Sequence, residues 1–170
     1  VLFRSEILKE KYSNIKALCI GDGQNKEILN ESIISKNLQN DIFMLGYRED
    51  VNKLINISDI GILMSYREGL PRNIMEFMAS GRKVIATNIR GCRDLLCNET
   101  IGTLVNVGDY EETAKAIEKY YLSRDREFNV SNEIKKYDIE SVNSELLKIY
   151  ESIELEINYE KGMSSYVSNR

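Results

Sequence analysis

Residues 60–87 read IGILMSYREGLPRNIMEFMASGRKVIAT. The runs from Ile60 to Met64 and from Lys83 to Thr87 are short and apolar, which is typical of buried strands. Between them, a polar loop leads into a segment with helical periodicity, from Pro71 to Ser80, and Gly81 closes that segment. A strand, a helix and a second strand in this order predict a βαβ unit with parallel strands.

The same alternation continues on both sides of this unit. Further strands are predicted at 15–20, 42–45 and 103–107, and further helices at 2–11, 25–35, 50–57, 93–96, 110–121, 126–135 and 139–157. Alternating helices and strands predict an α/β, Rossmann-like fold, with a mostly parallel sheet, helices on both faces and a helical C-terminal extension. We expect residues 1–158 to form one domain and residues 159–170 to be a frayed tail.

The loop inside the βαβ unit combines a helix start with two carboxylates. Pro71 suits the first helical position, because its missing N–H would have no partner there. The backbone N–H groups of Arg72 and Asn73 would then point out of a helix N-terminus, where phosphates commonly bind. Seven residues separate Glu68, just before this anion site, from Glu76, inside the helix. Since a carboxylate does not usefully face a phosphate, each Glu is predicted to accept hydrogen bonds from hydroxyl groups, as a nucleotide sugar would offer.

The surrounding residues carry a resemblance to a known family. It rests on Glu68-Gly69-Leu70-Pro71, Glu76, Ala79-Ser80-Gly81 and Val84-Ile85-Ala86-Thr87. This pattern resembles the nucleotide-sugar-binding half of the retaining glycosyltransferases of family 4, which have the GT-B fold. Residues 65–95, with Gly91-Cys92-Arg93-Asp94, are most similar to the branch that builds bacterial capsule, exopolysaccharide and lipid-linked glycans.

The resemblance implies a role for each matching residue. Glu76 would bind the ribose 2′- and 3′-hydroxyls, while Glu68 would reach hydroxyls of the transferred sugar and act as the catalytic residue. The implied donor-binding residues are Glu68, Gly69, Leu70, Pro71, Arg72, Asn73 and Glu76. The loop Gly46-Tyr47-Arg48 matches the family loop beside the nucleobase, so Tyr47 and Arg48 are candidate base-binding residues.

Plainer explanations exist for the same residues. Glu76 could form a surface ion pair with Arg72, four positions earlier on the helix. Glu68 could simply complement the helix dipole. The segment containing Tyr47 could be an ordinary loop, and Cys92 is interpreted as a small packing residue, because the sequence has no histidine to activate it.

The main catalytic task in such a transfer is to stabilise the leaving group, because negative charge grows on the nucleoside diphosphate. The sequence contains no histidine and no Asp-x-Asp, so no metal site and no cofactor are expected. A helix N-terminus together with basic side chains, Arg72 among them, would stabilise that charge instead. Retention of configuration is implied by the resemblance alone.

Composition restricts the class of protein. Charged residues make up 29% and apolar residues 42% of 170, as in soluble globular proteins, and no apolar run approaches the roughly 20 residues of a membrane span. The net charge of −4 argues against nucleic-acid partners, although residues 67–93 carry a local excess of basic residues. Three cysteines without C-x-x-C spacing and no visible secretory signal favour reduced thiols and a cytoplasmic location.

Relative to the family, the chain is expected to be a donor-binding half. The family's half opens with a strand carrying Gly-Arg and a following Lys-Gly, and an acceptor-binding domain precedes it. Without that strand, the sheet would have a gap between the strands 15–20 and 60–64. The full-length enzyme would move a sugar, from a UDP-sugar, to a hydroxyl of a glycan or lipid-linked acceptor held through the other domain, with peripheral association at the inner membrane face. Alone, this half should be inactive.

Two other classes of function stay open. One is a non-catalytic, regulatory nucleotide-binding module with the same loop. The other is an NAD-type Rossmann domain, which is disfavoured because Gly21-Asp22-Gly23 is followed by Lys26 where a third glycine belongs. A plain turn explains Gly21-Asp22-Gly23 better.

Overall fold

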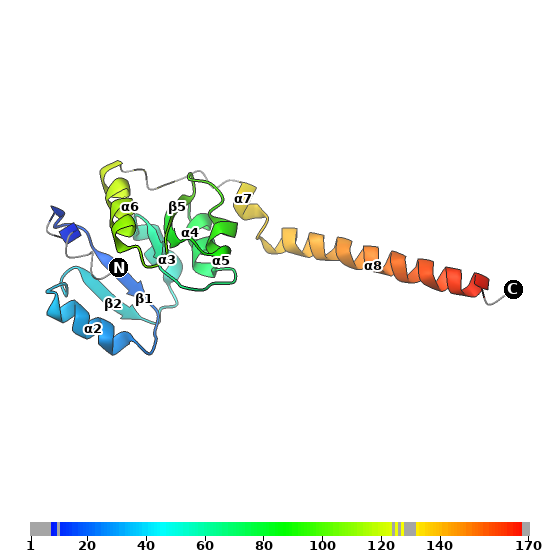
Figure 1. Cartoon of the computed structure of the whole chain (residues 1–170), viewed down its shortest axis with the longest axis horizontal. Helices are drawn as coiled ribbons and strands as arrows, with labels where there is room; N and C mark the ends of the chain where they lie inside the picture. The colour runs from blue at the N-terminus through cyan, green and yellow to red at the C-terminus, as the bar shows by residue number, and fades with distance from the viewer. Residues whose placement is uncertain (1–7, 10, 124, 126, 128–131, 168–170) are drawn as a thin grey trace. The chain divides into compact units, whose positions relative to one another are not determined.

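The computed structural model describes residues 8–9, 11–123, 125, 127 and 132–167. Its elements follow one another along the chain as shown in Figure 1: β1 (Ala17–Ile20), α2 (Lys26–Ser35), β2 (Ile42–Gly46), α3 (Val51–Ile57), β3 (Gly61–Leu63), α4 (Arg72–Ala79), β4 (Val84–Thr87), α5 (Arg90–Leu95), β5 (Gly102–Val105), α6 (Tyr110–Ser123), α7 (Asn132–Lys135) and α8 (Ile139–Val167). The chain divides into two compact units, Val1–Val130 and Ser131–Arg170.

The first unit is an α/β structure whose strands are all parallel. One sheet has the order β3-β4-β5, and a second sheet contains β1 and β2. Helix α4 packs against β3 and β4, whereas α6 packs against β4 and β5. Every residue of β4 is buried, so both of its faces are covered, as expected for a parallel strand between helices. The predicted fold class is therefore confirmed.

Helices α4 and α6 pack on the three-stranded sheet through buried side chains. Ile85 of β4 and Val105 of β5 pack with Ala116 and Tyr120 of α6. Helix α4 packs closely on β3. A Cβ at Gly61 would lie only 2.8 Å from the Phe77 ring, so the absence of a side chain at Gly61 allows this close packing. A side chain at that glycine would push α4, and the loop before it, away from the sheet.

The β1–β2 sheet is covered by α2 on one face. Ile33 and Leu38 pack there with Ile42, while Leu18 and Phe43 are 37% and 40% exposed. Within the part of the chain that the structure describes, no strand pairing joins β1 or β2 to β3. The two sheets are therefore separated between β1 and β3, at the position where a gap in the sheet was predicted from the sequence.

Several element boundaries differ from the sequence-based ones. Helix α4 begins at Arg72, and Pro71 is its N-cap residue with an extended backbone (φ −72°, ψ 109°), not the first helical residue. The fixed φ of proline suits both positions, so sequence alone does not choose between them. Strand β5 ends at Val105, before the predicted 107, because the chain turns at Gly108 with φ +77°.

Other differences concern helices. Helix α5 starts at Arg90 and not at 93, since Ile89 is already its extended N-cap residue. Of the predicted helix 126–135, only α7 is helical among the described residues, and Glu127 instead bridges Arg82 antiparallel. The predicted helix 2–11 lies largely outside the described residues, although Leu8 and Lys9 are helical.

Helix α8 (Ile139–Val167) extends beyond its predicted end. The helix continues to Val167, through most of the segment predicted to fray, because only Gly162 interrupts a run of helix-compatible residues. Apolar residues of this helix lie at the surface, since Val142 and Leu146 are 40% and 44% exposed. None of the described helices is both long and apolar enough to cross a membrane.

Candidate functional site

Glu68 lies in the loop that follows β3, and two strand ends fix it. The Ser65 hydroxyl donates a hydrogen bond to Glu68 Oε1 at 2.7 Å. The Ser65 carbonyl in turn accepts a hydrogen bond from Thr87 Oγ1, at the end of β4, at 2.6 Å. Thr87 is buried and Glu68 is half-buried, so the carboxylate is tied to the carboxyl edge of the sheet while part of it faces solvent.

The first turn of α5 supports the same loop from the next strand. A Cβ at Gly91 would lie 2.2 Å from the Gly69 carbonyl oxygen and 2.9 Å from that of Glu68. Only a glycine allows this approach without movement of the backbone. The neighbouring Cys92 is fully buried, and burial, followed by the negative charge of Glu68, raises the pKa of its thiol. Cys92 is therefore a packing residue, as its sequence context predicted.

The N-terminus of α4 follows this loop directly. Its N-cap residue, Pro71, has no side chain that could cap the helix. Asn73 Oδ1 accepts the N–H of Ile74 at 2.8 Å, which satisfies one of the free donors of the first turn. The N–H groups of Arg72 and Asn73 have no side-chain cap, and the side chains of both residues are exposed. This end of α4 can accept an anion.

Glu76 lies on α4, and its side chain is exposed. In the described part of the chain no ion pair joins Arg72 to Glu76, so the structure does not favour the surface-pair explanation. The carboxylate is available to a ligand.

Basic side chains surround the Glu68 loop. Arg67, Arg72 and Arg90 are exposed, and no carboxylate among the described residues pairs with any of them. Arg93 donates to the Asn88 carbonyl at 3.2 Å. Unpaired arginines beside a helix N-terminus create a positive potential suited to phosphate groups.

The basic stretch 67–93 does not act as one surface, contrary to the simplest interpretation of its charge. Arg82 and Lys83 precede β4, at the opposite edge of the sheet from Glu68. There Arg82 pairs with Glu127 at 2.5 Å and the buried Lys83 pairs with Asp125 at 2.6 Å. These two residues have a structural role, because parallel strands separate their two ends by the length of the strand.

Tyr47 and Arg48 follow β2, in the other sheet. Tyr47 is 75% exposed, and its N–H donates to Asp22 Oδ2 at 3.3 Å, so the turn after β1 lies beside it. Arg48 binds both oxygens of Asp50 at 2.8 Å, which raises the pKa of Arg48 and lowers the pKa of Asp50. The Tyr47 ring is free to stack on a base, whereas Arg48 is already occupied.

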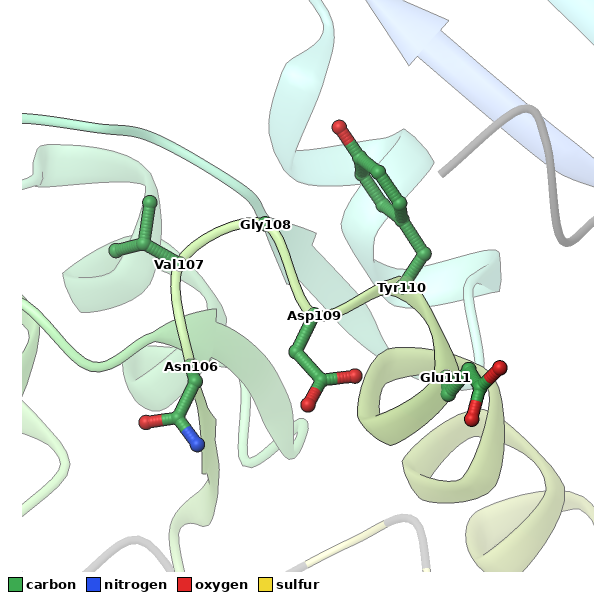
Figure 2. Close-up of a pocket in the computed structure, with 6 residues that line it drawn as sticks. All are labelled: Asn106, Val107, Gly108, Asp109, Tyr110 and Glu111. Carbon is green, nitrogen blue, oxygen red and sulfur yellow. The ribbon is translucent and has the colours of Figure 1, made fainter.

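Sequence reasoning missed the residues that hold the loop and a hollow beside it. The Ser65-x-x-Glu68 spacing was a usable signal, since residues three apart in a turn often hydrogen bond. The hollow has a volume of about 540 Å³ and lies along Asn106–Glu111, after β5 (Figure 2). A connected cleft of about 200 Å³ reaches Met64, Tyr66, Thr87 and Thr113. Neither cavity is lined by Glu68 or Glu76.

Two further features complete the geometry. Interaction with the neighbouring phenol of Tyr66 raises the pKa of Tyr110. No group of three or more His, Cys, Asp or Glu side chains within the described residues is arranged to hold a metal ion.

Comparison with known proteins assigns the family. Residues 5–138 match the family described as glycosyl transferases group 1. The chain belongs to this family. It is 37% identical over 91 residues to an uncharacterized glycosyltransferase of Methanocaldococcus jannaschii, covering 53% of this chain and 22% of that protein. It is also 31% identical over 99 residues to the UDP-Gal:alpha-D-GlcNAc-diphosphoundecaprenol alpha-1,3-galactosyltransferase of Escherichia coli, covering 58% of this chain and 26% of that protein.

Solved structures of GT-B glycosyltransferases share the fold. Anabaena Alr3699/HepE in complex with UDP and glucose superposes with a TM-score of 0.76 at 22% identity, over 89% of this chain and 44% of that chain. This glycosyltransferase group 1 chain therefore spans less than half the length of the proteins it matches.

Proposed function

We propose that this glycosyltransferase group 1 chain is the donor-binding half of an enzyme that transfers a sugar from a UDP-sugar to a hydroxyl group. The observation that carries the proposal is the half-buried Glu68, held by Ser65 directly before the uncapped N-terminus of α4. An oriented carboxylate beside an anion-binding helix end provides acceptors for sugar hydroxyls next to a place for phosphates.

The diphosphate would lie at the N-terminus of α4. The N–H groups of Gly69, Leu70, Arg72 and Asn73 would donate to it, with Gly69 and Pro71 shaping the approach. The unpaired guanidinium groups of Arg67, Arg72 and Arg90 would add positive charge. Together they would stabilise the charge that grows on the leaving nucleoside diphosphate, without a metal ion.

The remaining donor contacts follow from the positions of the two glutamates and of the β2 loop. Glu76 would accept both ribose hydroxyls, since its exposed carboxylate is not engaged by Arg72. Glu68 would bind the transferred sugar and act near the reaction centre. Tyr47 would flank the base, while Arg48 would position the loop through Asp50. Retention of configuration follows from the resemblance to family 4.

The proposal also covers the acceptor and the cellular location of the full-length enzyme. The name of the Escherichia coli relative specifies a UDP-sugar donor and a diphosphoundecaprenol acceptor. We infer a glycan or lipid-linked acceptor for this chain's full-length enzyme, in the branch that builds capsule, exopolysaccharide or lipid-linked glycans. Such an enzyme would work in the cytoplasm at the inner face of the membrane, and its other domain would supply the acceptor site, so the isolated half would not catalyse transfer.

Ligand-observed NMR of the chain against UDP-, GDP- and ADP-sugars and NADH tests the proposal. We expect the strongest signals from the UDP-sugar, and we expect Glu76→Gln to weaken them. Glu154→Gln, on α8, is the matched control and should bind as the unaltered chain does. Preferential binding of NADH, or equal loss in both variants, would contradict the proposal.

A further inference from the structure

The turn after β1 and the loop after β2 meet at the carboxyl ends of these two paired strands. Ile20, at the end of β1, is in register with Gly46, at the end of β2. The Gly21 N–H donates to the Gly46 carbonyl at 2.8 Å. Gly46 has a φ of +66°, which favours glycine, so the chain turns sharply directly before Tyr47. The turn Gly21-Asp22-Gly23 therefore adjoins the candidate base-binding loop.

The Asp22 carboxylate binds a donor from each of two other segments. Its Oδ2 accepts the Tyr47 N–H at 3.3 Å, and its Oδ1 accepts Lys26 Nζ, from the first residue of α2, at 2.6 Å. The hydrogen bond from Lys26 lowers the pKa of Asp22, so this carboxylate is ionised at neutral pH. A Cβ at Gly46 would lie 3.6 Å from Lys26 Nζ and 3.7 Å from Asp22 Oδ2. The ion pair thus lies directly against the turn of the β2 loop.

The backbone of the Tyr47 loop is held on both sides, while its ring stays open. Asp22 binds the Tyr47 N–H, and Arg48 binds both oxygens of Asp50 directly before α3. The Tyr47 side chain is nevertheless 75% exposed. An exposed aromatic ring on a fixed backbone suits stacking on a flat base, because little ordering remains to be done when the ligand binds.

We propose that Asp22 is a positioning residue for nucleotide binding, which holds the Tyr47 backbone so that the Tyr47 ring stacks on the base. The inference rests on the proposed function, because it requires a donor base beside the β2 loop. Asp22 acts through Tyr47, and Lys26 keeps the Asp22 carboxylate charged and oriented. Lys26, at the position of the missing third glycine, thereby supports the base-binding loop.

The direction of the change in affinity separates positioning from charge. UDP is an anion, so removal of the negative charge of Asp22 should by itself tighten UDP binding slightly. Loss of positioning should weaken UDP binding instead, because the Tyr47 loop must then be ordered when the ligand binds. Pyrophosphate has no base, so its binding should not weaken.

Isothermal titration of the chain with UDP and with pyrophosphate tests the proposal. Asp22→Ala should weaken UDP binding by about threefold or more, with pyrophosphate binding unchanged or slightly tighter. Glu27→Ala is the matched control, because it removes an exposed carboxylate from the first turn of α2, and it should not weaken UDP binding. If Asp22→Ala does not fold, as judged by circular dichroism, Lys26→Met replaces it. Lys26→Met should weaken UDP more than pyrophosphate, whereas loss of charge alone would weaken both alike.

A double-mutant cycle shows whether Asp22 acts through Tyr47. Tyr47→Ala should weaken UDP binding by about fivefold or more, as expected for the loss of one base–aromatic stack. In that background Asp22→Ala should cause little further loss, since no ring remains to be positioned.

The outcomes distinguish this inference from the donor proposal. UDP binding that Asp22→Ala leaves unchanged, equal losses for UDP and pyrophosphate, or additive losses in the double variant would overturn the role of Asp22 while the donor proposal stands. Absence of UDP binding in the unaltered chain would overturn the donor proposal and the role of Asp22 with it.

Discussion

The Ser65 hydroxyl donates a hydrogen bond to Glu68 Oε1 at 2.7 Å, while the Ser65 carbonyl accepts one from Thr87 at the end of the next strand. The proposed catalytic carboxylate is thus oriented by a residue of its own loop, and that residue is held by β4. Such support keeps a reacting group within the narrow range of positions that catalysis needs.

Ser65→Ala should therefore weaken sugar binding more than nucleotide binding. Hydrogen bonds to charged groups contribute roughly 1.5–3 kcal/mol, so UDP-glucose affinity should fall by about tenfold or more. UDP alone, which lacks the sugar bound by Glu68, should bind almost unchanged. Isothermal titration of both ligands measures the difference, and Ser152→Ala on α8 serves as control. Equal losses for UDP and UDP-glucose would show that Ser65 does not act through Glu68.

Glu76→Gln should raise the donor KM of the enzyme that includes the acceptor domain. Gln keeps the shape of the side chain but removes the charge that holds both ribose hydroxyls. Donor affinity should fall by about ten- to a hundredfold, with a smaller change in kcat. Steady-state kinetics with varied donor concentration measure this, and an unchanged donor KM in a folded variant would remove the ribose assignment.

Glu68→Gln should affect kcat rather than the donor KM. Because Glu68 is expected beside the transferred sugar, its loss should lower kcat more than donor affinity. Single-turnover rates at saturating donor separate the two effects. A variant with normal kcat would exclude Glu68 from the reaction centre.

Gly91→Ala should destabilise the chain. Its Cβ would lie 2.2 Å from the Gly69 carbonyl oxygen, so the Glu68 loop or α5 must shift. Overpacking of this kind lowers the free energy of unfolding by about 1–3 kcal/mol. Gly23→Ala is the matched control, since a Cβ there meets nothing within 4 Å, and its change should stay within about 0.5 kcal/mol. Urea denaturation compares the two variants, and equal stabilities would contradict the close contact.

Cys92 should make stability fall at alkaline pH. Its folded-state pKa is raised, mainly by burial, so the folded chain keeps a proton that the unfolded chain loses above about pH 8.5. The contribution of this thiol is complete below that pH and is lost as the pH rises through the folded-state pKa. Urea denaturation of Cys92→Ala across this range should show a flatter pH dependence, whereas Cys97→Ala, at an exposed site, should behave as the unaltered chain. Identical slopes in all three proteins would contradict the prediction.

Local sequence patterns were sufficient to predict the helices and strands and the residues of the proposed donor loop. Apolar spacing in segments such as Val84–Thr87 depends on side chains within a few residues of one another, so strands, helices and their parallel order could be predicted. The Glu68–Glu76 spacing and the helix start near Pro71 are local features of the same kind.

Contacts between residues far apart in the sequence could be seen only once the chain was folded. The fold established several of them. It brought Thr87 and Gly91 to the Glu68 loop, placed Lys83 with Asp125 at the opposite edge, and left β1 and β3 unpaired within the described chain. It also brought Tyr66 and Tyr110, which are far apart in sequence, to the lining of one cleft. These relationships depend on strand register and on how helices pack on the sheet, and both are set by contacts between segments that no local pattern records.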